Sequence, residues 1–308
     1  MSLHRHAHAQ TGKVLQWSLV ATLLFVVIEL IAGLRAGSLA LISDAGHNFT
    51  DALSLVLAAI GLYLQSRPAD SVKTYGYHRA GVLTAFVNAL TLVGISVFIF
   101  YEAWRRFLNP EPVQEWTMFW VALAAIALNG GVMWGLHRDK DHDLNIRAAF
   151  MHMLGDAVSS MAIVLGAVII HFTKWTVIDP ALSVLIGAFI IWTAWDIIKE
   201  SLNVLLEGLP RGMELSEVTS ALMGLEGVID VHDLHIWSLG SSAHALSCHV
   251  LIQDMPPSES NSILDRINQL LCKFDIHHTT IQFEHTKCAL SESPCSLLVP
   301  AHQHHHDA

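Results

Sequence analysis

The sequence predicts an α-helical membrane protein with six transmembrane helices and a C-terminal cytoplasmic α+β domain. Of the 308 residues, 53% are hydrophobic and only 14% are charged, whereas soluble globular domains carry about 25% charged residues. The apolar residues gather into six long runs, and polar segments of short period follow Gly208. This composition excludes a single soluble globular domain.

Each apolar run is long enough to cross a hydrocarbon core of about 30 Å at about 1.5 Å per helical residue. We expect no cleavable signal peptide, because the first run lacks a short apolar core with a small-residue cleavage site. The predicted membrane domain covers residues 14–207, after a tail at 1–13. We place its spans at 14–34, 40–64, 80–101, 118–136, 146–172 and 180–202.

The basic residues of the short loops predict the orientation of the spans, because lysine and arginine favour cytoplasmic loops. The loops after spans two and four are the more basic. We therefore expect both termini in the cytoplasm and the protein in the cell inner (cytoplasmic) membrane. These loops contain Arg67, Lys73, Arg79, Arg138, Lys140 and Arg147, against Arg35, Arg105, Arg106 and Lys174 on the opposite side.

The net charge of −10, together with the lack of a Lys/Arg block in the soluble part, argues against nucleic acid as a partner. The six spans make the lipid bilayer a partner instead. The four cysteines, Cys248, Cys272, Cys288 and Cys295, all fall in the cytoplasmic part, where stable disulfides are disfavoured.

Two spans carry a histidine and an aspartate four residues apart. They are His47 with Asp51, and His152 with Asp156. Residues at i and i+4 share one face of a helix. If the two faces meet, two imidazoles and two carboxylates form the ligand set of a tetrahedral zinc ion. A metal site buried in a bilayer points to transport.

An alternative is that these polar groups only join helices, with Gly46 and Gly155 permitting close approach. A structural hydrogen bond does not need four ionisable groups arranged as the same motif twice. Two neutral imidazoles and two carboxylates also balance the charge of a divalent cation, so a loaded site is nearly neutral in a medium of low dielectric constant.

Other polar residues in the spans have other expected roles. Asp44 lies one turn from the first pair and is a candidate to guide ions or to hydrogen-bond a ligand. We expect Glu29, Asn88 and Asn129 to make helix–helix contacts or to line a cavity. Asp179 precedes Pro180, which predicts an N-cap followed by proline at the first helical position.

Three stretches resemble the cation diffusion facilitator family of zinc transporters, of the bacterial inner-membrane efflux type. Residues 38–51 read SLALISDAGHNFTD and resemble the second-helix signature of the family. Residues 74–80 read TYGYHRA and resemble its entry to the third helix. Residues 231–239 read VHDLHIWSL and resemble the first strand of its cytoplasmic domain. The resemblance covers about residues 14–287.

The resemblance implies a homodimer that exports Zn(II) from the cytoplasm by antiport against protons and so serves metal homeostasis. It also implies a ferredoxin-like cytoplasmic domain. His47, Asp51, His152 and Asp156 match the transport-site positions of the family. A histidine at the first of these positions implies a preference for zinc over cadmium.

The ligand chemistry predicts how protons take part. Metal ligands must be deprotonated, so zinc and protons compete for the same side chains. Free imidazole titrates near 6.5. We expect alternating access, with His47 and His152 as the proton carriers.

The soluble part, residues 208–287, reads as helix, strand, strand, helix and strand, which predicts an open α+β sandwich. We place these elements at 214–225, 228–239, 243–252, 258–274 and 277–284. An exposed histidine in such a domain is, taken singly, a surface residue.

The resemblance implies a second zinc site in this domain, for a structural or regulatory ion. His232 and His249 match its regulatory ligands, Glu284 matches an acidic ligand on the last strand, and His285 is a candidate to bridge metals. His235 is as good a candidate for an outer contact as for a ligand. Cys288 and Cys295 are a weaker zinc pair, because six residues separate them, and we favour an inert tail for this segment.

Some family members carry another metal site in the loop between spans two and three. This loop keeps Asp70, but Lys73 and Tyr77 occupy the surrounding positions, so we predict that the site is absent. The tails, residues 1–13 and 288–308, carry histidines that we expect to gather zinc weakly and to be dispensable for transport. They are His4, His6, His8, His302, His304, His305 and His306.

Three alternatives remain at this stage. A membrane-embedded zinc enzyme needs an open coordination position and a general base, as in His-Glu-x-x-His, and the sequence has no such motif. A metal sensor would not need a titratable site in the bilayer. Within transporters, Cd(II), Co(II), Ni(II) or Fe(II) is the alternative cargo, whereas mixed imidazole and carboxylate ligation disfavours Mn(II) and Mg(II).

Overall fold

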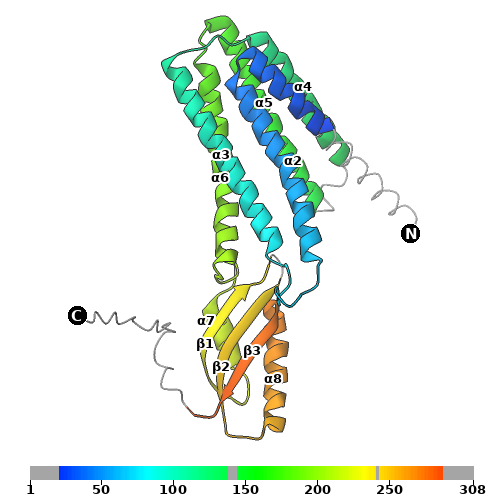
Figure 1. Ribbon diagram of the computed structural model, residues 1–308, viewed down its shortest axis with the longest axis vertical. Helices are drawn as coiled ribbons and strands as arrows, with labels where there is room; N and C mark the ends of the chain where they lie inside the picture. Colours follow the sequence, from blue (N-terminus) through cyan, green and yellow to red (C-terminus); the bar gives the residue numbers. More distant parts are fainter. Residues whose placement is uncertain (1–20, 138–143, 241–242, 287–308) are drawn as a thin grey trace, which may run out of the picture. The chain divides into compact units, whose positions relative to one another are not determined.

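The computed structural model describes residues 21–137, 144–240 and 243–286 (Figure 1). The chain forms two compact units. The first contains the chain up to Tyr63 and residues Thr84–Lys199. The second contains Leu64–Leu83, which links two helices, and the chain from Glu200 onward.

The first unit is a bundle of long helices. Five helices in the described residues are long and apolar enough to cross a membrane. They are preceded by a helix whose described part covers residues 21–36, and the start of the first predicted span lies outside the described residues. The prediction of a multi-pass α-helical membrane protein is confirmed. The five helices are α2 (Leu39–Gln65), α3 (Ala80–Leu108), α4 (Glu115–Leu136), α5 (Leu144–Thr173) and α6 (Ile178–Leu205).

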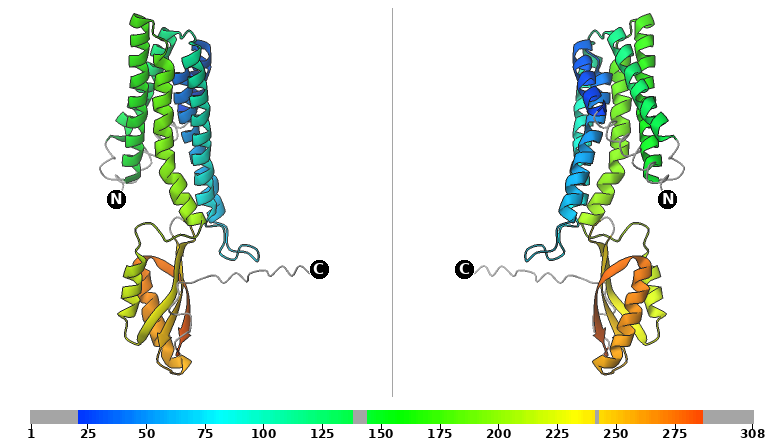
Figure 2. Two further views of the ribbon diagram at one scale, coloured as in Figure 1. Left: turned by 90° about the vertical axis from the view of Figure 1, so that its left-hand side faces the viewer. Right: turned by 90° about the vertical axis from the view of Figure 1, so that its right-hand side faces the viewer.

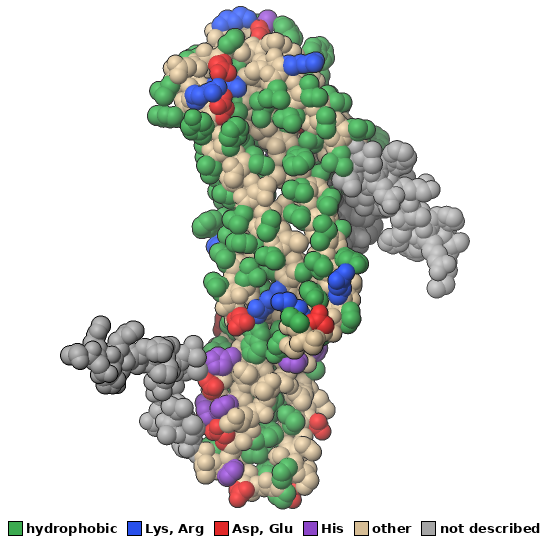
Figure 3. Space-filling view, viewed as in Figure 1, with side chains coloured by type: hydrophobic (Ala, Val, Ile, Leu, Met, Phe, Trp, Pro, Cys, Tyr) green, Lys and Arg blue, Asp and Glu red, His purple; other side chains and the backbone are tan. Residues whose placement is uncertain are grey.

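Apolar side chains cover the outside of this bundle as well as its interior. The interior contains small and branched residues such as Ala89, Ile163 and Ile190, all nearly inaccessible. On the face shown in Figure 3, hydrophobic side chains cover the middle of the bundle and charged side chains gather mainly toward its ends. In water, so much exposed apolar surface would drive association, whereas in a bilayer it faces lipid.

Helix α3 extends seven residues beyond the predicted span, to Leu108. Its last turns carry ion pairs that stabilise a helix outside hydrocarbon. Glu102 Oε1 accepts from Arg105 at 2.9 Å and from Arg106 at 3.2 Å. These pairs are three and four residues apart, the spacing at which side chains meet on one helix face. Hydrophobicity alone therefore underestimates the length of this helix.

Asp179 does not cap its own helix as the sequence predicted. Helix α6 begins at Ile178, and the fully buried Asp179 carboxylate caps the N-terminus of α2 instead. It accepts hydrogen bonds from the Ser38 hydroxyl at 2.6 Å and from the Leu39 amide at 2.7 Å. Arg106 of α3 lies 3.6 Å from it. The free amides of a helix N-terminus attract a carboxylate, so one side chain ties α2, α3 and α6 together.

The cytoplasmic domain has the predicted α+β order. The sheet has the order β1-β2-β3, with β1 antiparallel and β3 parallel to β2. Helices α7 and α8 cover one face of it (Figure 2). The elements are α7 (Leu215–Met223), β1 (Val228–Ser238), β2 (His244–Ile252), α8 (Pro257–Leu271), the 3₁₀ turn Cys272–Phe274 and β3 (Ile276–Glu284).

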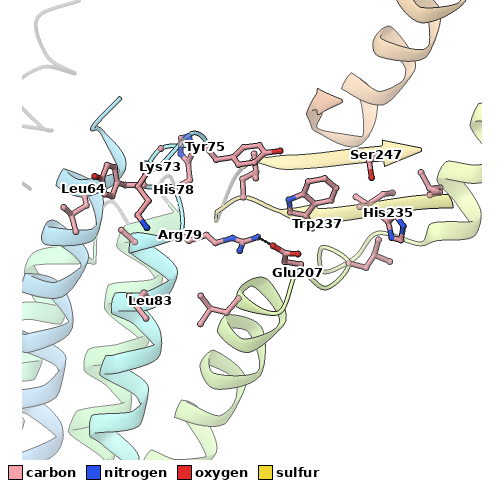
Figure 4. A pocket seen from close by; sticks show the side chains of 18 of the residues that line it. Leu64, Lys73, Tyr75, His78, Arg79, Leu83, Glu207, His235, Trp237 and Ser247 are labelled. Carbon is pink, nitrogen blue, oxygen red and sulfur yellow. Dashed lines mark hydrogen bonds and ion pairs between the residues drawn. The ribbon is translucent and has the colours of Figure 1, made fainter. Parts of the chain in front are cut away.

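The α2–α3 loop packs against this domain within the second unit. Arg79 donates to Glu207 at 3.1 Å (Figure 4). A Cβ at position 240 would lie 2.8 Å from the His78 carbonyl oxygen, so this close approach requires Gly240. The loop and β1 line a cavity of about 970 Å³, whose wall is mostly apolar and includes Trp237. Neither metal-ligand cluster described below forms part of its wall.

Candidate metal centres

His47, Asp51, His152 and Asp156 converge between α2 and α5. The Nε2 atom of His47 lies 3.7 Å from a carboxylate oxygen of Asp51 and 3.7 Å from one of Asp156. The Nε2 atom of His152 lies 3.3 Å from Asp51 and 3.7 Å from Asp156. Each imidazole therefore faces both carboxylates, one on its own helix and one on the other helix.

These separations are close to those between the ligand atoms of a tetrahedral zinc ion. With Zn–N and Zn–O bonds of about 2.0–2.2 Å, neighbouring ligand atoms lie roughly 3.3–3.6 Å apart. Single ligand atoms of His47, Asp51 and Asp156 lie within 4.8 Å of one another, and His152 faces the same two carboxylates through the other oxygen of Asp156. The two imidazole centroids are 6.2 Å apart at 73°, so the rings approach from different directions.

The burial of the four groups is uneven. The side chain of Asp156 is 6% exposed, that of His47 14% and that of Asp51 28%, whereas His152 is 43% exposed. The site is thus closed on the Asp156 side and open at His152. Within the described residues, Asp51 Oδ2 is buried without a hydrogen-bond partner of good geometry. An oxygen left without a hydrogen bond beside two imidazoles is free to bind a cation.

The site depends on an antiparallel register of α2 and α5. His47 faces Asp156, and Asp51 faces His152. The second pair is therefore four residues further along α2 and four residues further back along α5. Gly155 does not serve close packing, because a Cβ there would meet nothing within 4 Å. Gly46 approaches Ile95 of α3 rather than α5. The four polar groups, and not a glycine contact, define the α2–α5 interface at this level.

A second cluster lies on the cytoplasmic sheet, with one ligand on each strand. His232 of β1 pairs directly with His249 of β2, and Glu284 lies on β3. The Glu284 carboxylate is 3.2 Å from His232 Nε2 and 3.0 Å from His249 Nδ1. Both ring nitrogens of His232 and Oε2 of Glu284 are buried without hydrogen-bond partners among the described residues. The donor set and its unsatisfied atoms suit a bound zinc ion.

Asp233 lies next to this second cluster, beside the His249 ring nitrogen that does not face Glu284, and the sequence did not indicate it. One of its oxygens lies 3.2 Å from His235 Nε2 and the other 3.8 Å from His249 Nε2. Its backbone is left-handed, with φ of 50°, at an irregularity in the β1–β2 register. In a regular strand Asp233 would point away from the face that carries His232. The irregularity turns it back, and strand alternation alone cannot predict that.

Two family descriptions match this chain. The cation efflux transmembrane domain matches residues 15–206, and the cation efflux protein cytoplasmic domain matches residues 210–286. The chain belongs to the cation efflux family. Membership agrees with the resemblance found in the sequence, and it makes this cation efflux protein a membrane transporter rather than an enzyme.

Bacterial relatives match this cation efflux protein over nearly its whole length. The cadmium, cobalt and zinc/H(+)-K(+) antiporter of Bacillus velezensis is 37% identical, covering 98% of this chain and 99% of the relative. The metal cation efflux system protein CzcD of Cupriavidus metallidurans is 38% identical, covering 94% and 92%. The zinc transporter ZitB of Pectobacterium atrosepticum is 38% identical, covering 98% and 93%.

The remaining predicted ligands have different outcomes. His285 is exposed next to Glu284 and lies outside the cluster of His232, His249 and Glu284. Cys288, Cys295 and the tail histidines lie outside the described residues. Burial raises the pKa of the Cys248 thiol to about 12, so Cys248 is a neutral core residue at physiological pH. Metal ligation needs the thiolate.

Asp70 in the α2–α3 loop is held by the loop itself. Its Oδ1 accepts hydrogen bonds from the amides of Val72 and Lys73, both at 2.7 Å, and its Oδ2 accepts one from the Tyr77 hydroxyl at 3.0 Å. The amide hydrogen bonds from Lys73 and Val72 lower the pKa of Asp70, and the bond to Asp70 raises the pKa of Tyr77. The carboxylate thus organises a turn.

Proposed function

We propose that this cation efflux protein exports Zn(II) from the cytoplasm and takes up protons in exchange. In this proposal zinc is the substrate, held by His47, Asp51, His152 and Asp156. The observation that supports it is the spacing of the four groups, 3.3–3.7 Å between facing nitrogen and oxygen atoms. That spacing is close to the edge of a zinc-centred tetrahedron, roughly 3.3–3.6 Å.

The donor types favour zinc over hard cations. Imidazole suits zinc and its neighbours in the first transition series, whereas Mg(II) and Mn(II) favour oxygen ligands. Two carboxylates cancel the charge of one divalent cation, which keeps the loaded site neutral inside the membrane. Cd(II) and Co(II) are the second candidates, because two of the relatives are named for cadmium and cobalt or for metal cations generally. Ni(II) and Fe(II) follow.

Protons enter the proposal through competition for the same ligands. Zinc binding requires neutral imidazoles and ionised carboxylates, so loading the site releases protons. Protons arriving from the other side of the membrane then displace the metal. Free imidazole titrates at about 6.5, which makes His47 and His152 the proton carriers in an alternating-access cycle.

The cytoplasmic domain has a different proposed role. We assign His232, His249 and Glu284 to a resident zinc ion that stabilises the domain or regulates transport. The matched cytoplasmic domain belongs to a family of dimerisation domains, and we assign to it the contact of a homodimer. The proposed organisation is a cytoplasmic tail at 1–13, a membrane domain at 14–207, this domain at 208–287 and a second tail at 288–308, in the inner membrane with both termini cytoplasmic.

Zinc flux into inverted membrane vesicles with an acidic lumen tests the proposal. The native protein should load zinc and make the lumen more alkaline, as a trapped pH dye reports. Asp51→Ala should reduce both signals to those of vesicles without the protein. Asp265→Ala is the matched control, because Asp265 is an exposed aspartate on α8. Normal zinc flux in Asp51→Ala refutes the site, and zinc flux without a change in lumen pH refutes the exchange.

A further inference from the structure

Two more carboxyl groups are buried in the helical bundle beside the four ligands. Glu29, on the first helix, is 0% exposed, and Asp44, on α2, is 1% exposed. Among the described residues, neither forms an ion pair with a lysine or an arginine. A buried carboxylate in a membrane is costly unless hydrogen bonds satisfy it, so the hydrogen-bond partners of each group decide which of the two can be ionised.

Asp44 receives hydrogen bonds from α5. Ser159 donates to its Oδ1 at 3.1 Å and Ser160 donates to its Oδ2 at 3.2 Å. Asp44 lies three residues before His47, and the two serines lie three and four residues after Asp156. The contact therefore repeats the antiparallel α2–α5 register one helical turn from the ligands.

Glu29 joins the same network from the first helix. Asn48 donates to its Oε2 at 3.3 Å, while its Oε1 is buried and lacks a partner if the group is ionised. Asn48 lies four residues after Asp44 on the same face of α2, so its hydrogen bond to Glu29 brings the Glu29 and Asp44 carboxyl groups within reach of each other. Two carboxylates have no donor between them, so one must carry a proton.

The hydrogen-bond directions place that proton on Glu29. Asp44 already accepts from both serines, which suits an ionised carboxylate. A proton on Glu29 donates to Asp44 and leaves the other Glu29 oxygen to accept from Asn48. Every polar atom of the pair is then satisfied. The titratable groups that face the pair are His47 on α2 and Asp156 on α5.

We propose that Glu29 remains a neutral acid throughout transport and that Asp44 is a fixed carboxylate that sets the α2–α5 register and strengthens cation binding at the neighbouring site. Asp44 is thus a positioning residue that does not touch the metal. The inference rests on the proposed function and deepens it, because it separates carboxyl groups that exchange protons from one that does not.

Infrared spectroscopy and two substitutions of Glu29 test the protonation state. The native protein in liposomes should show the C=O band of a buried carboxylic acid, unchanged between about pH 6 and 8, where imidazole titrates. Glu29→Gln should remove the band. Glutamine reproduces the neutral acid, since its amide nitrogen donates to Asp44 and its oxygen accepts from Asn48. Glu29→Ala should weaken zinc binding and Glu29→Gln should restore it.

Zinc binding to the purified protein tests the role of Asp44. Asp44→Asn keeps the size of the side chain and removes its charge, so we expect about tenfold weaker binding, equivalent to about 1.4 kcal/mol. Replacing both Ser159 and Ser160 by alanine keeps the charge and removes the donors. We expect a smaller loss of zinc affinity from that variant. If Asp44→Asn does not fold, the double serine variant still tests whether the α5 donors to Asp44 support zinc binding.

Three outcomes overturn the inference. One is a native protein without the acid band or with a band that titrates in this pH range. Another is Glu29→Gln protein that binds zinc normally but has lost zinc-driven proton movement, since Glu29 would then exchange its proton. The third is unchanged zinc affinity in Asp44→Asn. The infrared and binding readouts do not need transport, so their failure is distinguishable from failure of the proposed exporter.

Discussion

In the membrane bundle, two histidines and two aspartates face one another across two long helices, whereas in the cytoplasmic sheet two histidines and one glutamate lie across three hydrogen-bonded strands. The helix pairs come from i, i+4 positions on α2 and α5, and each helix supplies one histidine and one carboxylate. The strand cluster takes one ligand from each strand, held by the β1–β2–β3 ladder. Backbone hydrogen bonds therefore join the elements of the strand cluster, whereas α2 and α5 meet through side chains.

The difference fits a transported ion at the α2–α5 cluster and a resident ion at the cluster on the cytoplasmic sheet. If α2 and α5 separate by a small distance, the nitrogen–oxygen pairs between the helices open together, and the metal loses half of its ligands. The strands of a sheet cannot separate without breaking backbone hydrogen bonds. The charge also differs, because one carboxylate leaves a bound zinc ion with net positive charge, which costs less free energy outside a membrane than inside it.

The largest expected effect comes from removing one carboxylate from each cluster. Asp156→Ala should reduce zinc flux in vesicles to background, because the cargo site loses a ligand and half of its negative charge. Glu284→Ala should leave most of the flux, because we assign that cluster to a resident ion rather than to the cargo. Equal loss of flux in both variants would contradict the distinction between cargo and resident ion.

The number of bound zinc ions per chain sharpens the same comparison. Asp156→Asn and Glu284→Gln should each lower the zinc content of the dialysed protein by about one ion, and the double variant by about two, because the two clusters share no ligand. Elemental analysis measures the content. If either single variant removed both ions, the two clusters would be coupled rather than independent.

A smaller effect is expected from Asp179, which anchors α2 but touches no ligand. Asp179→Ala leaves Arg106 and the first α2 amides without their acceptor, so we expect a loss of about 3 kcal/mol in stability. Ser38→Ala removes only one donor to the same carboxylate and should cost about 1 kcal/mol. Thermal unfolding in detergent measures both. Similar unfolding midpoints for Asp179→Ala and native protein would show that Asp179 does not stabilise the contact between α2, α3 and α6.

The two clusters also differ in how far the sequence predicts them. The i, i+4 pairs of His47 with Asp51 and His152 with Asp156 stand out in an apolar background, because helical spacing alone puts each pair on one face. The cytoplasmic ligands are 17 and 35 residues apart (His232, His249, Glu284), and only the strand register brings them together. Without the family resemblance, nothing in their spacing predicts a site.

Sequence spacing does not predict the contacts of residues whose partners lie on other helices or strands. Asp179 next to Pro180 fits a local N-cap, but a carboxylate binds whichever free amides are closest in space, and here they belong to α2. Asp233 was missed because the irregularity of β1 reverses its direction. Glu29 was expected only to contact another helix or to line a cavity, and its hydrogen-bonding reach to Asp44 depends on how the first helix packs.

The smallest expected effect concerns Asp70, where a third metal site would lie in some family members. The folded-state pKa of Asp70 is lowered. Its ionised form therefore stabilises the loop above the unfolded pKa of about 3.9, and this contribution is lost only as the pH falls through the lower folded value. The hydrogen-exchange protection of residues 70–77, measured relative to the unfolded chain at each pH, should stay constant from about pH 8 to 5 in the native protein.

Substitution of the same residue separates a turn from a metal site. Asp70→Asn should lower that protection at neutral pH, because a neutral amide oxygen accepts more weakly than a carboxylate from the amides of Val72 and Lys73. Strand β2 should stay protected and serves as the internal control. The variant should also keep its full zinc content, because the carboxylate is already engaged by the loop. If Asp70→Asn lost a zinc ion, Asp70 would be a ligand of a third zinc site in the α2–α3 loop.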